Sequence, residues 1–113
     1  MILYLEAETD ISDLVIDFIE VRLRSGKVVS LNWDESGSES EPDNSYYAVY
    51  EGVNFDEECA DGRAGELEGM QVVHVEPYSY SGQTGFIRIK KMLFEDGGRM
   101  MRFEEPFLQT KAA

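Results

Sequence analysis

Apolar and polar residues alternate along much of the chain, with the two-residue period of strands whose faces meet different surroundings. Residues 19–24 show this pattern, and it returns from Val29 to Trp33 after a Ser-Gly pair. The two runs predict an antiparallel hairpin. A three-residue loop, Arg24–Gly26, pairs Val21 with Val29 and keeps one face wholly apolar, which a two-residue loop would not. Trp33 continues that face, so we expect it to be buried.

The later part of the chain predicts a second hairpin, closed by Asp96–Gly98. With these three residues as the loop, Glu95 faces Arg99 across the hairpin. A two-residue turn at Asp96–Gly97 would instead set Lys91 against Arg102. Because opposite charges across a strand pair are stabilising and like charges are not, the three-residue loop is favoured.

Further strands are expected over 2–8, 46–53 and 70–76, where apolar residues again alternate with polar ones. Residues 9–18 have apolar positions at helical spacing behind a capping residue and predict a short helical turn. Acidic residues at the start of 56–60 favour a second such turn. The predicted fold class is therefore mainly β or α+β, an antiparallel sheet built from hairpins with at most one or two short helices.

The length of 113 residues predicts a single compact domain, 1–113, and a hydrophobic content of 42% is enough for a core. Polar, acid-rich segments predict loops at 34–45 and 54–69. No apolar run approaches the ~18 residues that a membrane span needs, and the first residues lack the pattern of a signal peptide. The single Cys59 agrees with a reducing compartment, so we expect a cytoplasmic protein.

Charge is the strongest compositional signal, because 23 acidic residues oppose 10 basic ones and give a net charge of −13. Residues 28–62 hold ten of the acids and no Lys or Arg, whereas most basic residues fall within 22–27 and 88–102. This balance disfavours direct binding to nucleic-acid phosphates or to an anionic membrane. It favours a protein partner with a basic surface, or else a merely solvated acidic face.

Motifs that carry chemistry are not evident. Cys59 and His74 are the only residues of their types and lack a family signature, and structural zinc needs about four such ligands. Calcium-loop spacing fails from both Asp34 and Asn54. A weak cation site at 56–58 stays open, but we expect no enzyme, no cofactor and no built metal site.

Tyrosines form a second group of candidate contact residues, since tyrosine is enriched at protein interfaces. We expect Tyr46, Tyr50 and Tyr80 to be partly exposed. Tyr47 shares a strand face with Val49, and we expect that face to point into the core.

The acidic runs 34–41 and 54–58, the small size and the sheet-rich pattern resemble those of small acidic phage or mobile-element proteins of the anti-CRISPR type. The resemblance implies a non-enzymatic inhibitor, a nucleic-acid mimic that occupies a basic groove of a nucleic-acid-binding protein such as an RNA-guided nuclease. The alternative is a small prophage accessory or assembly protein that binds a protein partner through a sheet edge. Steep weakening of binding with salt favours the mimic.

Partner-binding residues are predicted among the acids of the two loops and the neighbouring tyrosines. They are Asp34, Glu35, Glu39, Glu41, Asp43, Tyr46, Tyr50, Asp56, Glu57, Glu58 and Asp61. Glu6 and Glu8 add an anionic row, because strand residues two apart point the same way at ~6.5 to 7 Å.

Overall fold

The described part of the chain is built from β-strands. The computed structural model describes residues 1–11, 13–40, 43–55, 67–78 and 85–104, and no α-helix occurs among them. Its strands are β1 (Ile2–Thr9), β2 (Ile16–Arg22), β3 (Val28–Asn32), β4 (Glu35–Ser40), β5 (Ser45–Glu51), β6 (Asn54–Phe55), β7 (Gln71–Pro77), β8 (Ile87–Asp96) and β9 (Arg99–Glu104). The prediction of a mainly β fold is confirmed.

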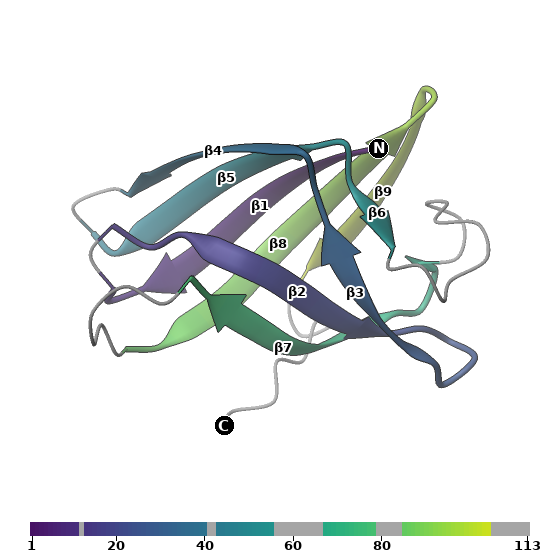
Figure 1. Ribbon diagram of the computed structural model, residues 1–113, viewed down its shortest axis with the longest axis horizontal. Helices are drawn as coiled ribbons and strands as arrows, with labels where there is room; N and C mark the ends of the chain where they lie inside the picture. Colours follow the sequence, from purple (N-terminus) through teal and green to yellow (C-terminus); the bar gives the residue numbers. More distant parts are fainter. Residues whose placement is uncertain (12, 41–42, 56–66, 79–84, 105–113) are drawn as a thin grey trace.

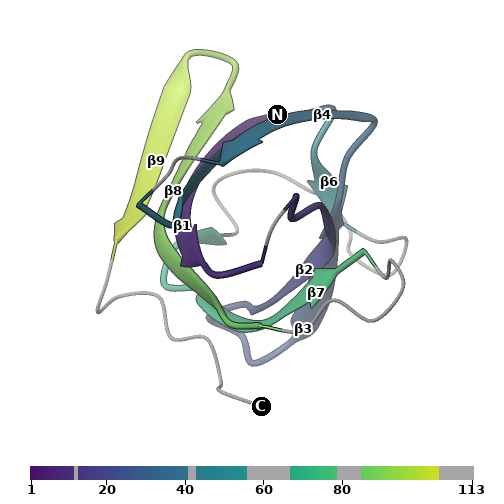
Figure 2. The same ribbon diagram turned by 90° about the vertical axis from the view of Figure 1, so that its left-hand side faces the viewer.

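The strands form two antiparallel sheets that curve around one core (Figure 1). One sheet has the order β4-β5-β1-β8-β9 and the other the order β6-β3-β2-β7. Only two residues separate β3 from β4, and two separate β5 from β6, so both connections pass from one sheet to the other. In Figure 2 the β8–β9 hairpin extends away from the ring that the other strands form.

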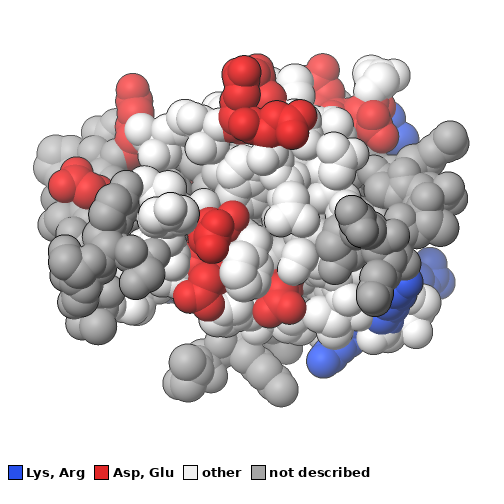
Figure 3. Space-filling view, viewed as in Figure 1, with Lys and Arg blue, Asp and Glu red and all other residues white. Residues whose placement is uncertain are grey.

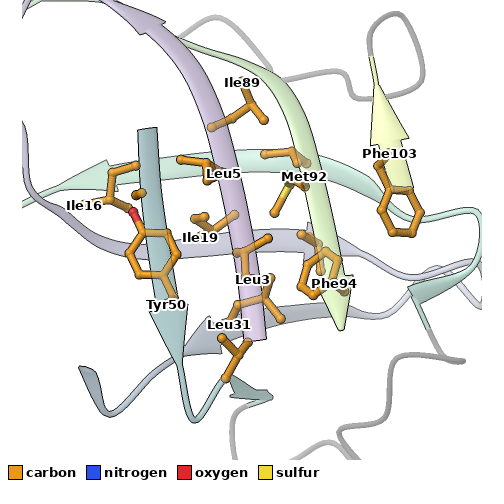
Figure 4. Close-up of a cluster of buried hydrophobic side chains, with 14 of the residues drawn as sticks. Leu3, Leu5, Ile16, Ile19, Leu31, Tyr50, Ile89, Met92, Phe94 and Phe103 are labelled. Carbon is orange, nitrogen blue, oxygen red and sulfur yellow. The ribbon is translucent and has the colours of Figure 1, made fainter. Parts of the chain in front are cut away.

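Alternate side chains of both sheets fill the core (Figure 4). Leu3 and Leu5 of β1 and Met92 of β8 point from the five-stranded sheet toward Ile19 and Leu31 of the other sheet. Each of these five side chains is buried. Burial of such side chains, each worth about 1.5–3 kcal/mol, fixes which face of each strand points inward.

The first hairpin has the predicted register. Val21 lies opposite Val29, and the Leu23 N–H donates to the Lys27 carbonyl oxygen at 2.7 Å, which leaves three residues in the loop. Gly26 closes the loop with a φ of +94°, a conformation that glycine adopts without the strain a side chain would add. The apolar face therefore determined this register.

The predicted register of the second hairpin is wrong by one residue. Gly97 and Gly98 form a two-residue turn, both with positive φ, and Asp96 rather than Glu95 lies opposite Arg99. Two adjacent glycines suit the tight turn whose two central residues are both left-handed, and its twist matches that of the strands. Opposite charges still face each other across the hairpin, as predicted. The predicted three-residue loop is wrong.

The predicted loop at 34–45 is also wrong. Residues 35–40 are strand β4, which pairs with β5 along its whole length. The backbone hydrogen bonds of this pairing stabilise a Ser- and Gly-rich sequence that has little strand propensity of its own. Of the predicted loop at 54–69, residues 54–55 are β6. The helical turn predicted at 56–60 lies outside the described residues.

The helical turn predicted within 9–18 does not form. Thr9 ends β1, and its Oγ1 donates to the Phe86 carbonyl oxygen at 2.7 Å and accepts from the Ile11 N–H at 3.1 Å. Asp13 has a φ of +55°, which no right-handed helix accommodates. These side-chain hydrogen bonds hold a connection that buries Ile11 without a helix.

The face of β5 that points inward is the opposite of the predicted one. Tyr46 and Tyr50 are each 1% exposed, whereas Tyr47 is 45% and Val49 39% exposed. In the middle of this strand both sets of alternate residues are apolar or aromatic, so alternation there did not identify the core face. Trp33 is partly buried against the core, in agreement with its predicted burial, and its ring packs on that of Tyr50 with centroids 4.0 Å apart.

Candidate protein-binding face

A row of apolar side chains crosses the outer face of the five-stranded sheet. Val49 of β5 lies opposite Tyr4 of β1, which in turn lies opposite Leu93 of β8. Val49 and Tyr4 are each 39% exposed, and Tyr47 beside them is 45% exposed. We call these four residues the apolar row. Side chains of this kind, contiguous across three strands, are typical of a surface that a partner covers.

Carboxylates lie next to the apolar row on the edge strand β4 and on its neighbour β5. Glu35 lies opposite Glu51, and Glu39 lies opposite Tyr47. All three carboxylates are exposed, and we call them the acidic border. In the described residues no basic side chain is ion-paired with any of them. Directly opposed like charges destabilise a strand pair, so this border is a local cost to the fold.

A small hollow opens between the acidic border and the apolar row. It is lined by Glu35, Ser36, Gly37, Val49 and Glu51 and has a volume of about 230 Å³. Gly37 creates it, since a Cβ at this position would have no atom within 4 Å. The hollow is smaller than the roughly 300–1,000 Å³ of ordinary small-molecule sites, which makes it suited to a side chain rather than a cofactor.

β4 lies at the edge of its sheet. Among the described residues its strand neighbour is β5 alone, and residues 35–39 are all exposed. Where β3 gives way to β4, the Asp34 N–H donates to the Glu51 carbonyl oxygen at 2.9 Å. Gly52 has a φ of +68°, and a Cβ there would collide with the Asp34 carboxylate. This corner therefore fixes the start of β4 against the end of β5.

Charge is segregated over the face shown in Figure 3, on which the four-stranded sheet lies in front. On the face shown, Lys and Arg side chains lie toward the right-hand side, where the turns of the β2–β3 and β8–β9 hairpins lie in Figure 1. Acidic side chains occupy the top, centre and left of the same face. Such a distribution produces a negative field over one part of the molecule, which attracts a basic partner.

Several predicted contact residues lie on or beside the outer face of the five-stranded sheet. Asp34 precedes β4, and Glu35 and Glu39 are part of it. Asp43 is exposed before β5, where its Oδ1 accepts from the Ser45 N–H at 3.3 Å. The side-chain and backbone hydrogen bonds from Ser45 lower the pKa of Asp43. Asp43 is therefore ionised at neutral pH.

The remaining predictions for contact residues divide in two. Tyr46 and Tyr50 are core residues at 1% exposure, so their predicted partial exposure is wrong. Six other candidates lie outside the described residues: Glu41, Asp56, Glu57, Glu58, Asp61 and Tyr80.

The anionic row expected along β1 is partly neutralised within the molecule. Glu6 lies opposite Lys91, and Glu8 lies opposite Arg88, whose Nη1 is 3.8 Å from Glu8 Oε1. The side chains of Glu8 and Arg88 are largely exposed, so their ion pair contributes little to stability. By contrast, none of the three carboxylates of the acidic border is ion-paired with a basic side chain of the described residues.

Sequence analysis did not identify the apolar row or Glu51 as contact residues. Tyr4 and Leu93 alternate with core residues in their strands, and this signal was available in the sequence. The hollow at Gly37 and the opposition of Glu35 and Glu51 depend on β4 being a strand, which the sequence does not indicate.

His74 forms a partly exposed pair with Glu76 on β7. Its Nε2 is 2.7 Å from Glu76 Oε1, and both side chains are close to half exposed. Cys59 lies outside the described residues. Within the part of the chain that the structure describes, no group of three or more His, Cys, Asp or Glu side chains is placed to hold a metal ion.

Comparisons with protein-family models, with curated proteins and with solved structures find no match for this chain. Within the described ranges, no helix is long and apolar enough to cross a membrane.

Proposed function

We propose that this chain is a non-enzymatic, cytoplasmic binding protein whose acidic border engages a basic surface of a nucleic-acid-binding protein. In this role it acts as a nucleic-acid mimic, of the kind represented by anti-CRISPR inhibitors of RNA-guided nucleases. The observation that carries the proposal is the direct opposition of Glu35 and Glu51 on the exposed sheet face, where no basic side chain of the described residues is ion-paired with either. A cationic partner would relieve the repulsion between these carboxylates.

Spacing along β4 supports the mimicry. Glu35 and Glu39 lie on the same face four residues apart, a separation of about 13 Å in a strand. Two carboxylates held at a fixed separation on one strand can stand in for two of the backbone phosphates that a basic groove contacts. The net charge of −13 adds long-range steering toward a basic groove.

Capture from a host lysate at low and high salt tests the proposal. The triple variant Glu35→Gln, Glu39→Gln, Glu51→Gln removes the acidic border. The control variant Asp17→Asn, Glu20→Gln, Glu68→Gln removes three charges from residues outside the five-stranded sheet. We expect the wild type and the control to retain a nucleic-acid-binding protein at low salt and the border variant to lose it. Equal retention by both variants would overturn the proposal.

A second candidate function has one observation in its favour. Residues 35–40, predicted as a loop, are an edge strand, which suits a small accessory or assembly protein that pairs with a strand of its partner. Pairing through backbone hydrogen bonds is insensitive to salt, because it does not depend on exposed charges. A complex that survives high salt and the loss of the acidic border would favour this function.

A further inference from the structure

We propose that the partner docks through an extended segment that adds to the free edge of β4 and carries an apolar side chain between two arginines at alternate positions. This inference rests on the proposed function and names the chemistry of the partner. The occupant is a basic strand of another protein, with the pattern Arg-x-apolar-x-Arg.

The outer face of β4 and β5 has the complementary pattern. Along β4 the alternate positions are Glu35, Gly37 and Glu39, that is acid, hollow and acid. A strand added beside β4 would place its own alternate side chains at the same spacing of ~6.5 to 7 Å. Two arginines would therefore align with Glu35 and Glu39, and the residue between them would align with Gly37.

The hollow gives the middle position its apolar preference. Val49 lies directly opposite Gly37 and is 39% exposed, so it lines a surface that a neighbouring apolar side chain would cover. The apolar row continues from Val49 to Tyr4 on the next strand. Burying a Leu-sized side chain here adds a contribution that salt does not weaken.

Arginine suits the flanking positions better than lysine does. Glu35 and Glu51 lie on directly opposed residues, and their Cβ atoms are therefore ~4.5 to 5.5 Å apart. A guanidinium has five N–H donors in a planar fork and pairs with two carboxylates at once, whereas an ammonium group is a compact and strongly hydrated point charge. The acidic border therefore selects arginine.

The free edge supplies the main-chain partners. Among the described residues β4 has a strand neighbour on one side only. Its serines have small side chains and Gly37 has none, which leaves the backbone accessible. Edge strands are a general site of strand addition. A second copy of this chain is a poor occupant, because each copy carries a net charge of −13.

Synthetic peptides test the inference without the natural partner. The probe is the peptide Ac-Ser-Arg-Ser-Leu-Ser-Arg-Ser-amide, and the comparison peptide has the same composition and charge with Leu moved outside the two arginines. A third peptide is the probe with N-methyl groups on alternate amides, which cannot pair with an edge. Binding is measured by the NMR shifts of the backbone amides of residues 35–39 and 49–51.

We expect the probe to shift these amides and to bind about tenfold more tightly than either other peptide. Gly37→Val fills the hollow and should cost about tenfold in affinity. It should not lower the melting temperature, because a Cβ at residue 37 meets no atom within 4 Å. Ser30→Val, on β3 of the other sheet, is the control and should bind as the wild type does.

Equal affinity for the probe and the permuted peptide would overturn the inference and leave the proposed function intact, since charge alone would then account for binding. An unaffected Gly37→Val variant, or shifts that appear with protein concentration in the absence of peptide, would also overturn it. The proposed function fails separately, when the variant without the acidic border still captures its partner.

Discussion

Glu35 of β4 lies directly opposite Glu51 of β5 on the exposed face of the five-stranded sheet, and no basic side chain of the described residues is ion-paired with either carboxylate. Like charges at directly opposed positions destabilise a strand pair. A fold selected for stability alone would have no reason to keep both residues acidic. A binding role for the pair would explain the presence of both acids.

Removing one of these charges should therefore stabilise the protein. We expect Glu51→Gln to raise the free energy of unfolding by about 0.2–1 kcal/mol, with the gain shrinking as salt screens the repulsion. Urea melts at low and high salt measure it. Glu20→Gln on β2 removes the same charge from the other sheet and should change stability less. A loss of stability in Glu51→Gln would show that the carboxylate has a stabilising partner.

Two glycines near this face should respond oppositely to alanine. Gly52 has a φ of +68°, and a Cβ there would collide with the Asp34 carboxylate, so Gly52→Ala should cost more than the ~1–2 kcal/mol of the left-handed conformation alone. Gly37 has open space around its Cβ position, so Gly37→Ala should gain about 0.5–1 kcal/mol. Thermal melts of both variants measure the two changes in stability. Equal changes in Gly52→Ala and Gly37→Ala would contradict the close contact of Gly52 with Asp34.

Trp33→Ala should destabilise the protein by about 2–3 kcal/mol. The side chain is half-buried and packs on Tyr50 with ring centroids 4.0 Å apart, so the loss should be smaller than the ~3–5 kcal/mol of a fully buried aromatic residue. Denaturant unfolding monitored by circular dichroism measures it. A loss below ~1 kcal/mol would mean that the tryptophan contributes little to the core.

Tyr50 makes stability sensitive to alkaline pH. Burial raises the pKa of its phenol, and the neighbouring Tyr46 raises it further. The folded state therefore keeps a proton that the unfolded chain releases above pH ~10, so the free energy of unfolding should fall as pH rises beyond that value. In Tyr50→Phe this fall should be smaller. An unchanged pH profile would mean that the phenol ionises equally in both states.

The same variant tests the buried hydroxyl of Tyr50, which has no hydrogen-bond partner of good geometry among the described residues. Removing an unsatisfied buried polar group is neutral or stabilising. At neutral pH we therefore expect Tyr50→Phe to leave stability unchanged or to raise it by up to about 1 kcal/mol.

Sequence alone predicts the parts of this fold that rest on one apolar face. The register of Val21 with Val29 follows from alternation and the position of Gly26, and the structure has that register. In β5 the central residues of both faces are apolar or aromatic, so the choice between Tyr46 and Tyr47 depends on how the two sheets pack. That information is not local to the strand.

The candidate site was harder to predict because β4 has no strand signal of its own. Its sequence from Glu35 to Ser40 reads as a polar loop, and it becomes a strand through its hydrogen bonds with β5. Only this pairing brings Glu35 opposite Glu51 and exposes Val49 beside Gly37. The acids were therefore identified from composition, while their arrangement required the fold.

The central claim is that the outer face of the five-stranded sheet takes the place of nucleic acid on a basic protein, and competition tests it most directly. The protein retained in the lysate capture is bound to a fluorescent nucleic acid and titrated with this chain or with its Glu35→Gln, Glu39→Gln, Glu51→Gln variant. We predict that the wild type displaces the nucleic acid, and that the variant needs about tenfold higher concentration at low salt. A stable ternary complex, with the nucleic acid still bound at saturating wild-type protein, would contradict the account.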